Sequence, residues 1–173
     1  MYKFLPYMTL FVVTSLLQVL FFNNLSVSVS FSPLVYVVFI LLLPLQIPHF
    51  GLLMAGLGMG VVMDWSMGAS GVNTIATLFI AFCRPYLLNI VVKKEVLAGS
   101  GVPSDLRLGE GAYSRYLILL VLLHHAVFFA LESLSLENWA LYALRFVVSS
   151  VASTLFVWLI ARVFVSLVLK KYK

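Results

Sequence analysis

The run LILLVLLHHAVFFAL, residues 117–131, is apolar throughout except for a pair of histidines. A surface helix of a soluble protein carries polar residues along one face, and a strand of a membrane β-barrel alternates apolar and polar residues. This run follows neither pattern. Continuous apolar stretches of this kind are typical of helices that cross a membrane, so we expect an all-α membrane protein.

The composition of the whole chain favours the same class. Of the 173 residues, 63% are hydrophobic and 10% are charged, whereas soluble domains have about 45–50% and about 25%. A soluble fold built from this chain would lack polar residues for its surface. The length suits one transmembrane domain over residues 1–173, without a soluble domain beside it.

Six segments approach the roughly 20 apolar residues that a spanning helix needs. The expected fold is therefore a polytopic bundle of about six transmembrane helices. The second and third spans are short and are joined by the proline-containing LPLQIPH, so a re-entrant or strongly kinked pair is the alternative. The six expected spans cover residues 4–22, 31–47, 49–65, 70–92, 115–134 and 140–168.

The distribution of basic residues indicates how the bundle is oriented. With six spans, the positive-inside rule places both termini and the loop 93–114 in the cytoplasm. Arg145 is an exception near the outer start of the last span, and we expect it to pair with Glu132 or Glu137. The cations are scattered over loops, so the net charge of +5 reflects membrane topology, and nucleic acid is not an expected partner. The basic residues on the cytoplasmic side are Lys3, Lys93, Lys94, Arg107, Arg115, Lys170, Lys171 and Lys173.

The stretch GLLMAGLGMGVVMDWSMGASGVNT, residues 51–74, contains a series of glycines followed by an isolated acid. Gly56, Gly60 and Asp64 are spaced four apart and share one helix face, while Gly58 points elsewhere. The spacing of Gly56 and Gly60 lets two helix backbones approach closely in lipid. We expect this face to pack against another helix, and the wall of a substrate pocket is the alternative.

Asp64 is expected near the outer membrane interface. It follows His49, at the inner turn, by fifteen residues, which is about 22 Å along a helix. A carboxylate at that depth is accessible to water, which weakens the functional interpretation of an intramembrane acid. We expect a structural role, in which Asp64 pairs with the amides of the next turn or with an arginine. Proton coupling is the alternative.

Polar residues form a stripe along the fourth span. Ser70, Asn73, Thr77 and Arg84 are spaced so that they share one face, which should point into the bundle because lipid tolerates such groups poorly. Arg84 is expected nearer the inner side, as a structural anchor for the bundle or for a partner protein. A direct bond between Arg84 and Asp64 is not expected, since it would have to span the bilayer.

Other candidate chemistry receives little support from the sequence. His124 and Glu132 lie eight residues apart, but His125 points about 100° away from His124, and no HExxH motif is present. We therefore interpret the histidines as packing or interface residues. The single cysteine, Cys83, lies in an apolar segment and is interpreted as a buried thiol. No catalytic grouping is apparent, so we expect no enzyme activity, no metal and no cofactor.

The glycine-rich stretch resembles the MreD family of bacterial rod shape-determining membrane proteins. Residues 51–74 carry the pattern Gly-x4-Gly-x3-Gly-x3-Asp-x3-Gly-x2-Gly-x-Asn-Thr. The segments FCRP, residues 82–85, and LLQVLFFNNL, residues 16–25, look like the Bacteroides-like branch of that family. The motifs cover about residues 16–90, while the topology is similar over the whole length.

The resemblance implies a non-enzymatic scaffold in the bacterial inner membrane. Such proteins bind MreC, and through it MreB, RodA and a class B penicillin-binding transpeptidase, in the complex that elongates the cell and builds peptidoglycan. The family also looks like the membrane-embedded substrate-binding subunits of energy-coupling-factor transporters. The alternative function is therefore a subunit that binds a small vitamin at the outer side, near Asp64 and Asn73. Against it, no Ala-x-x-x-Ala motif lies at an inner helix start.

Overall fold

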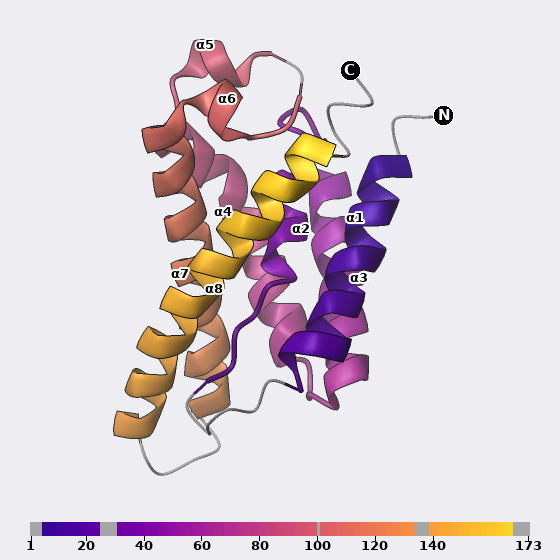
Figure 1. Ribbon diagram of the computed structural model, residues 1–173, viewed down its shortest axis with the longest axis vertical. Coiled ribbons are helices and arrows are strands. Elements are labelled where there is room, and N and C mark those ends of the chain that lie inside the picture. The colour runs from indigo at the N-terminus through magenta and orange to yellow at the C-terminus, as the bar shows by residue number, and fades with distance from the viewer. Residues whose placement is uncertain (1–4, 25–30, 100, 134–138, 168–173) are drawn as a thin grey trace.

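Long helices lie side by side along most of the chain in the computed structural model (Figure 1). The structure describes residues 5–24, 31–99, 101–133 and 139–167. In this part of the chain every regular element is helical. The elements are α1 (Leu5–Leu16), the π-helical η1 (Leu17–Phe22), α2 (Val37–Leu42), α3 (His49–Met67), α4 (Val72–Val91), α5 (Lys94–Leu97), α6 (Asp105–Leu108), α7 (Glu110–Ser133) and α8 (Trp139–Leu167).

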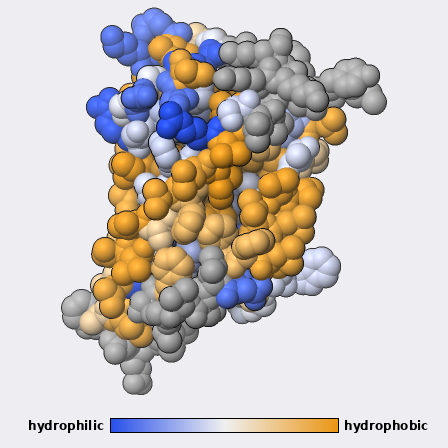
Figure 2. All heavy atoms as spheres, in the orientation of Figure 1, coloured by the Kyte–Doolittle hydropathy of each residue, from blue (hydrophilic) through white to orange (hydrophobic). Residues whose placement is uncertain are grey.

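Five of these helical stretches are long and apolar enough to cross a membrane. The first is α1 continued by η1, and the others are α3, α4, α7 and α8. Figure 2 shows an apolar band over the middle of the molecule, with polar residues gathered toward its ends. The prediction of an all-α, multi-pass membrane bundle is confirmed.

The segment 31–47 differs from the expected second span. It is irregular up to Tyr36, forms the short helix α2 over six residues, and becomes irregular again from Leu43. Pro44 accounts for the second boundary, because it disfavours helical geometry at Leu43, the residue before it, which has an extended backbone. The expected continuous helix over residues 31–47 is not formed, and the segment runs through the bundle as a short helix with irregular flanks, which is closer to the kinked alternative.

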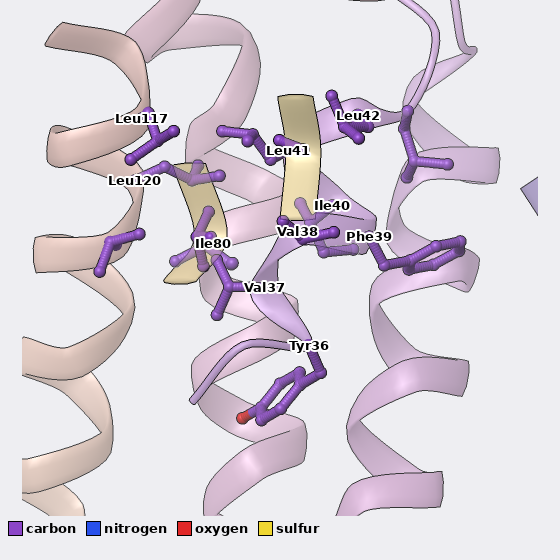
Figure 3. Close-up of a cluster of buried hydrophobic side chains, with 14 of the residues drawn as sticks. Tyr36, Val37, Val38, Phe39, Ile40, Leu41, Leu42, Ile80, Leu117 and Leu120 are labelled. Atoms are coloured by element: carbon purple, nitrogen blue, oxygen red, sulfur yellow. The ribbon is translucent and has the colours of Figure 1, made fainter. Parts of the chain in front are cut away.

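The short helix α2 lies in the centre of the bundle. All six of its residues are buried, and Figure 3 shows their side chains beside Ile80 of α4 and Leu117 and Leu120 of α7. A helix that is apolar on every side is either buried in protein or exposed to lipid. Composition alone made this segment resemble a lipid-exposed span, whereas protein surrounds it.

The two ends of the bundle differ in what they contain. The start of α1 and the end of α8 lie at the same end as α5 and α6, which we call the α5–α6 end (Figure 1). Gly68 ends α3 with a positive φ of 64° and begins the turn into α4. This turn lies at the other end, which we call the Gly68 end (Figure 1). The segment expected as the loop 93–114 contains both short helices, and α7 begins at Glu110 rather than 115. The expected basic residues Lys3, Lys170, Lys171 and Lys173, together with Glu137, lie outside the described residues.

Candidate functional site

Two glycines of α3, Gly56 and Gly60, face α4 at very short range. A Cβ atom on Gly56 would lie 2.8 Å from the Cβ of Ala81, and one on Gly60 would collide with the Cα of Thr74. A Cβ on Gly58 would meet nothing within 4 Å. Gly56 and Gly60 thus lie inside the intramolecular contact between α3 and α4. The expected roles were helix packing and, alternatively, the wall of a substrate pocket. The structure places both glycines in helix packing, and both are buried, out of reach of a partner protein.

Asp64 holds the start of α4. Its Oδ1 accepts the backbone N–H and the side-chain amide of Asn73, each at 3.0 Å. Its Oδ2 accepts the backbone N–H of Thr74 at 2.8 Å and also the Thr74 hydroxyl. The residue before α4 is Gly71, which has no side chain to cap the helix. Asp64 therefore supplies the cap from the preceding helix, and its negative charge lies at the positive end of the α4 dipole.

A chain of hydrogen bonds leads from Asp64 into the centre of the bundle. The Tyr36 hydroxyl donates to Asn73 Oδ1 at 2.8 Å and lies 3.0 Å from His124 Nε2. A hydroxyl has one proton, so His124 Nε2 must be the protonated nitrogen and donate to Tyr36. All four residues are buried. Three helices and the irregular segment before α2 are thereby joined through polar contacts.

Side chains from two helices satisfy the backbone of the irregular segment 31–36. Gln18, in η1, accepts the N–H of Val35 at 2.7 Å and donates to the carbonyl of Pro33 at 3.1 Å. Ser149 and Ser153, on α8, accept the N–H groups of Ser32 at 3.1 Å and Leu34 at 2.8 Å. Irregular backbone is tolerated at membrane depth only when protein satisfies its polar groups. We call residues 31–36 the buried strap.

His125 extends this support from α7. Its Nε2 lies 2.9 Å from the Ser153 hydroxyl, and its Nδ1 lies 2.9 Å from the carbonyl of Val121. Nδ1 must donate to the carbonyl, so Nε2 accepts the proton of Ser153. Adjacent histidines therefore act on different parts of the segment, since His124 contacts Tyr36 and His125 orients Ser153. Among the described residues no group of three potential metal ligands is present.

Arg84 closes the other end of α2. Its side chain is 1% exposed, and its guanidinium donates to the carbonyls of Leu43 and Pro44, the latter at 3.4 Å. Its Nε donates to the Tyr116 hydroxyl at 2.9 Å, which in turn donates to the carbonyl of Leu41 at 3.2 Å. A cation at the C-terminus of a helix stabilises its last carbonyls. Arg84 therefore anchors the bundle internally, and it is not bonded to Asp64.

Arg145 ties the buried strap to α7 at the Gly68 end. Its Nη1 lies 3.1 Å from Glu132 Oε1, and its Nη2 donates to the Ser32 hydroxyl at 3.3 Å. The guanidinium also lies 5.5 Å from the ring centre of Phe129 and 5.6 Å from that of Tyr142. Of the two acids expected to pair with Arg145, the structure places Glu132 beside it.

Several residues of this framework escaped sequence analysis. Tyr36, Tyr116, Ser149 and Ser153 belong to no motif, and Gln18 lies in the segment LLQVLFFNNL without having been singled out. The available signal was the presence of polar side chains inside apolar spans, which in membrane proteins usually face the interior. Their partners are backbone groups of a segment whose irregularity was not foreseen.

A hollow opens beside the buried strap at the Gly68 end, with a volume of about 400 Å³. Its polar lining includes Gln18, Asn23, Ser32 and Ser66. Asp64 and Asn73, the residues expected to line a ligand site, are not among its lining residues and are bonded to each other.

No protein-family model, curated protein or solved structure matches this chain. The resemblance to MreD and the likeness to transporter subunits stay predictions.

Proposed function

We propose that this chain is a non-enzymatic scaffold of the bacterial cell-elongation complex, similar in role to MreD. In this proposal it lies in the inner membrane with the α5–α6 end in the cytoplasm. It binds MreC, and through MreC it associates with MreB, RodA and a class B transpeptidase. Its contribution to cell shape and peptidoglycan synthesis is to hold these proteins together.

The observation that carries the proposal is that the buried charged side chains bond to other segments of the bundle. Asp64 accepts four hydrogen bonds from the start of α4, and Arg84 binds the end of α2 and Tyr116. Groups engaged in this way fix the relative positions of helices. A bundle with rigid internal connections and apolar outer helix faces suits a protein that positions others in the membrane.

Depletion of the protein in its host tests the proposal. Rod-shaped cells should become round, and an affinity-tagged copy should co-purify with an MreC-like protein. Normal shape after depletion, combined with the loss of uptake of a vitamin, would instead identify the protein as a transport subunit. Because Gly60 is internal, Gly60→Leu would damage the bundle itself, so substitutions on exposed helix faces are the appropriate probes of partner binding.

One observation favours the alternative of a solute-binding subunit. The hollow of about 400 Å³ at the Gly68 end falls in the range of about 300–1,000 Å³ that small-molecule sites occupy. Direct titration of the purified protein with vitamins, followed by calorimetry, separates the two functions. Saturable binding that Ser66→Trp abolishes would support a transport subunit. Absence of vitamin binding would support the scaffold function.

A further inference from the structure

A second hollow lies at the α5–α6 end, where the last turns of α8 pass α6 and the start of α7. It has a volume of about 200 Å³, which is room for about seven water-sized groups at roughly 30 Å³ each. Its lining combines opposite charges, two aromatic rings and two serine hydroxyls. The residues that matter here are Ser104, Asp105, Tyr113, Trp158, Arg162 and Ser166.

One side of the hollow is formed by α8. Trp158, Arg162 and Ser166 are spaced four residues apart and therefore share one face of this helix. The guanidinium of Arg162 lies 5.0 Å from the ring centre of Trp158, which holds it by a cation–π interaction. Arg162 makes no hydrogen bond or ion pair with any described residue. None of its five N–H donors is therefore taken up by a described residue.

A carboxylate from a different element lines the same hollow. Asp105 begins α6, and its Oδ1 accepts the backbone N–H of Leu106 at 2.8 Å. No ion pair joins Asp105 to Arg162 or to another described residue. The hollow therefore presents a cation and an anion that do not neutralise each other directly.

The hollow lies at the depth of the membrane interface. Arg162 follows Arg145 by seventeen residues on α8, which is about 25 Å along the helix, and the hydrocarbon core is about 30 Å thick. Arg145 lies at the Gly68 end, so Arg162 lies near the opposite boundary. Trp158 and Tyr113 are of the types enriched where the hydrocarbon meets the headgroups.

We propose that this hollow binds the headgroup of a zwitterionic phospholipid that carries a primary amine. Arg162 binds the phosphate through its guanidinium fork, and Asp105 accepts hydrogen bonds from the ammonium. The paired charges of the site match the paired charges of such a headgroup. An anionic lipid without an amine leaves Asp105 uncompensated, and a trimethylated ammonium has no N–H to donate. This inference does not depend on the scaffold function.

Native mass spectrometry of the detergent-purified full chain tests the site. The probes are phosphatidylethanolamine, phosphatidylcholine and phosphatidylglycerol with identical acyl chains. We expect phosphatidylethanolamine to be retained over the other two by roughly fivefold, the scale of one charge-assisted hydrogen bond at a partly exposed site. Equal retention of phosphatidylethanolamine and phosphatidylcholine, or a preference for phosphatidylglycerol, would overturn the proposal.

Variants assign the two charges to their roles. Asp105→Asn should remove the preference for phosphatidylethanolamine over phosphatidylcholine, and Arg162→Gln should weaken retention of all three lipids. The matched control is Arg115→Gln, because Arg115 is exposed near the same end and, among the described residues, donates to the carbonyl of Gly111 in its own helix. If Arg115→Gln reduced retention as much as Arg162→Gln does, the effect would be general surface charge and the site would be refuted. Thermal unfolding of each variant verifies that the fold is retained.

Discussion

At the scale of single residues, the spacing of Asp64 in the sequence predicts its position and structural role but not its bonding partners. Counting along the helix predicted a carboxylate near the end of α3 with a structural role, bonded to the amides of the next turn or to an arginine. The structure supplies the partners, the N–H groups of Asn73 and Thr74. The sequence offered no cap at Gly71, and the cap comes from seven residues earlier. Local rules for helix starts examine neighbouring residues and miss a cap that tertiary packing delivers.

Substitution of Asp64 should separate capping from charge. Asp64→Ala leaves two buried N–H groups of α4 without acceptors, a loss of about 1–3 kcal/mol. Asp64→Asn keeps one acceptor oxygen but turns an NH2 group toward donors, so we expect an intermediate loss of about 1 kcal/mol. Thermal unfolding in detergent checks the order. The control is Ser70→Ala, because Ser70, which was expected to point into the bundle, precedes α4 and is exposed. If Asp64→Asn were as damaging as Asp64→Ala, the negative charge itself would be the essential feature.

At the scale of elements, five of the six expected spans coincide with helices to within a few residues, apart from the earlier start of α7. Their apolar runs are long enough to cross a membrane, and a segment in lipid must be helical to satisfy its own backbone hydrogen bonds. Residues 31–47 could not be predicted in this way. The hydropathy of a buried six-residue helix and its flanks equals that of a lipid-exposed span. The side chains that permit an irregular path, Gln18, Ser149, Ser153 and Arg84, come from other parts of the chain.

Helix α3 should reject a methyl group at the glycine that contacts α4 and tolerate it at a glycine that does not. A Cβ on Gly60 would press against the Thr74 backbone, which cannot rotate away. Gly60→Ala should therefore cost about 1–3 kcal/mol of overpacking, which outweighs the gain in helix propensity of about 1 kcal/mol. Gly58→Ala meets no atom within 4 Å and should be neutral or stabilising. Chemical unfolding of both variants in the same detergent decides the comparison, and equal effects would contradict the close packing.

The buried strap should depend on Ser153 more than on any other hydroxyl of α8. Ser153→Ala removes the acceptor for the Leu34 N–H and the partner of His125 Nε2, so we expect a loss of about 1–3 kcal/mol. The amide of Leu34 should exchange with deuterium faster in this variant, while the amides of α7 are unaffected. Thr9→Ala is the control, because its exposed hydroxyl donates to the carbonyl of Leu5 in its own helix. An unchanged exchange rate at Leu34 would show that the strap is held by packing alone.

At the scale of the whole molecule, charged residues mark two levels about 25 Å apart. Arg115 and Glu132 on α7, and Arg145 and Arg162 on α8, are each separated by seventeen residues, which gives that distance along a helix. The spacing approaches the thickness of the hydrocarbon core, about 30 Å. The apolar band between the two levels is visible in Figure 2. The helices therefore share one membrane register, although the polar groups that join them lie on both sides of its midplane.

The distribution of basic residues predicts which side of the membrane each end faces. Lys93, Lys94 and Arg115 lie near the α5–α6 end, which the positive-inside rule places in the cytoplasm. In a Cys83→Ala background, Ser70→Cys and Gly111→Cys put one exposed thiol at each end, since Ser70 is exposed and a Cβ on Gly111 meets nothing within 4 Å. In intact spheroplasts a membrane-impermeant maleimide should label the thiol at position 70 and leave that at position 111 unlabelled until the membrane is permeabilised. The reverse pattern would invert the orientation and would place the α5–α6 end, with the proposed lipid site, at the outer leaflet.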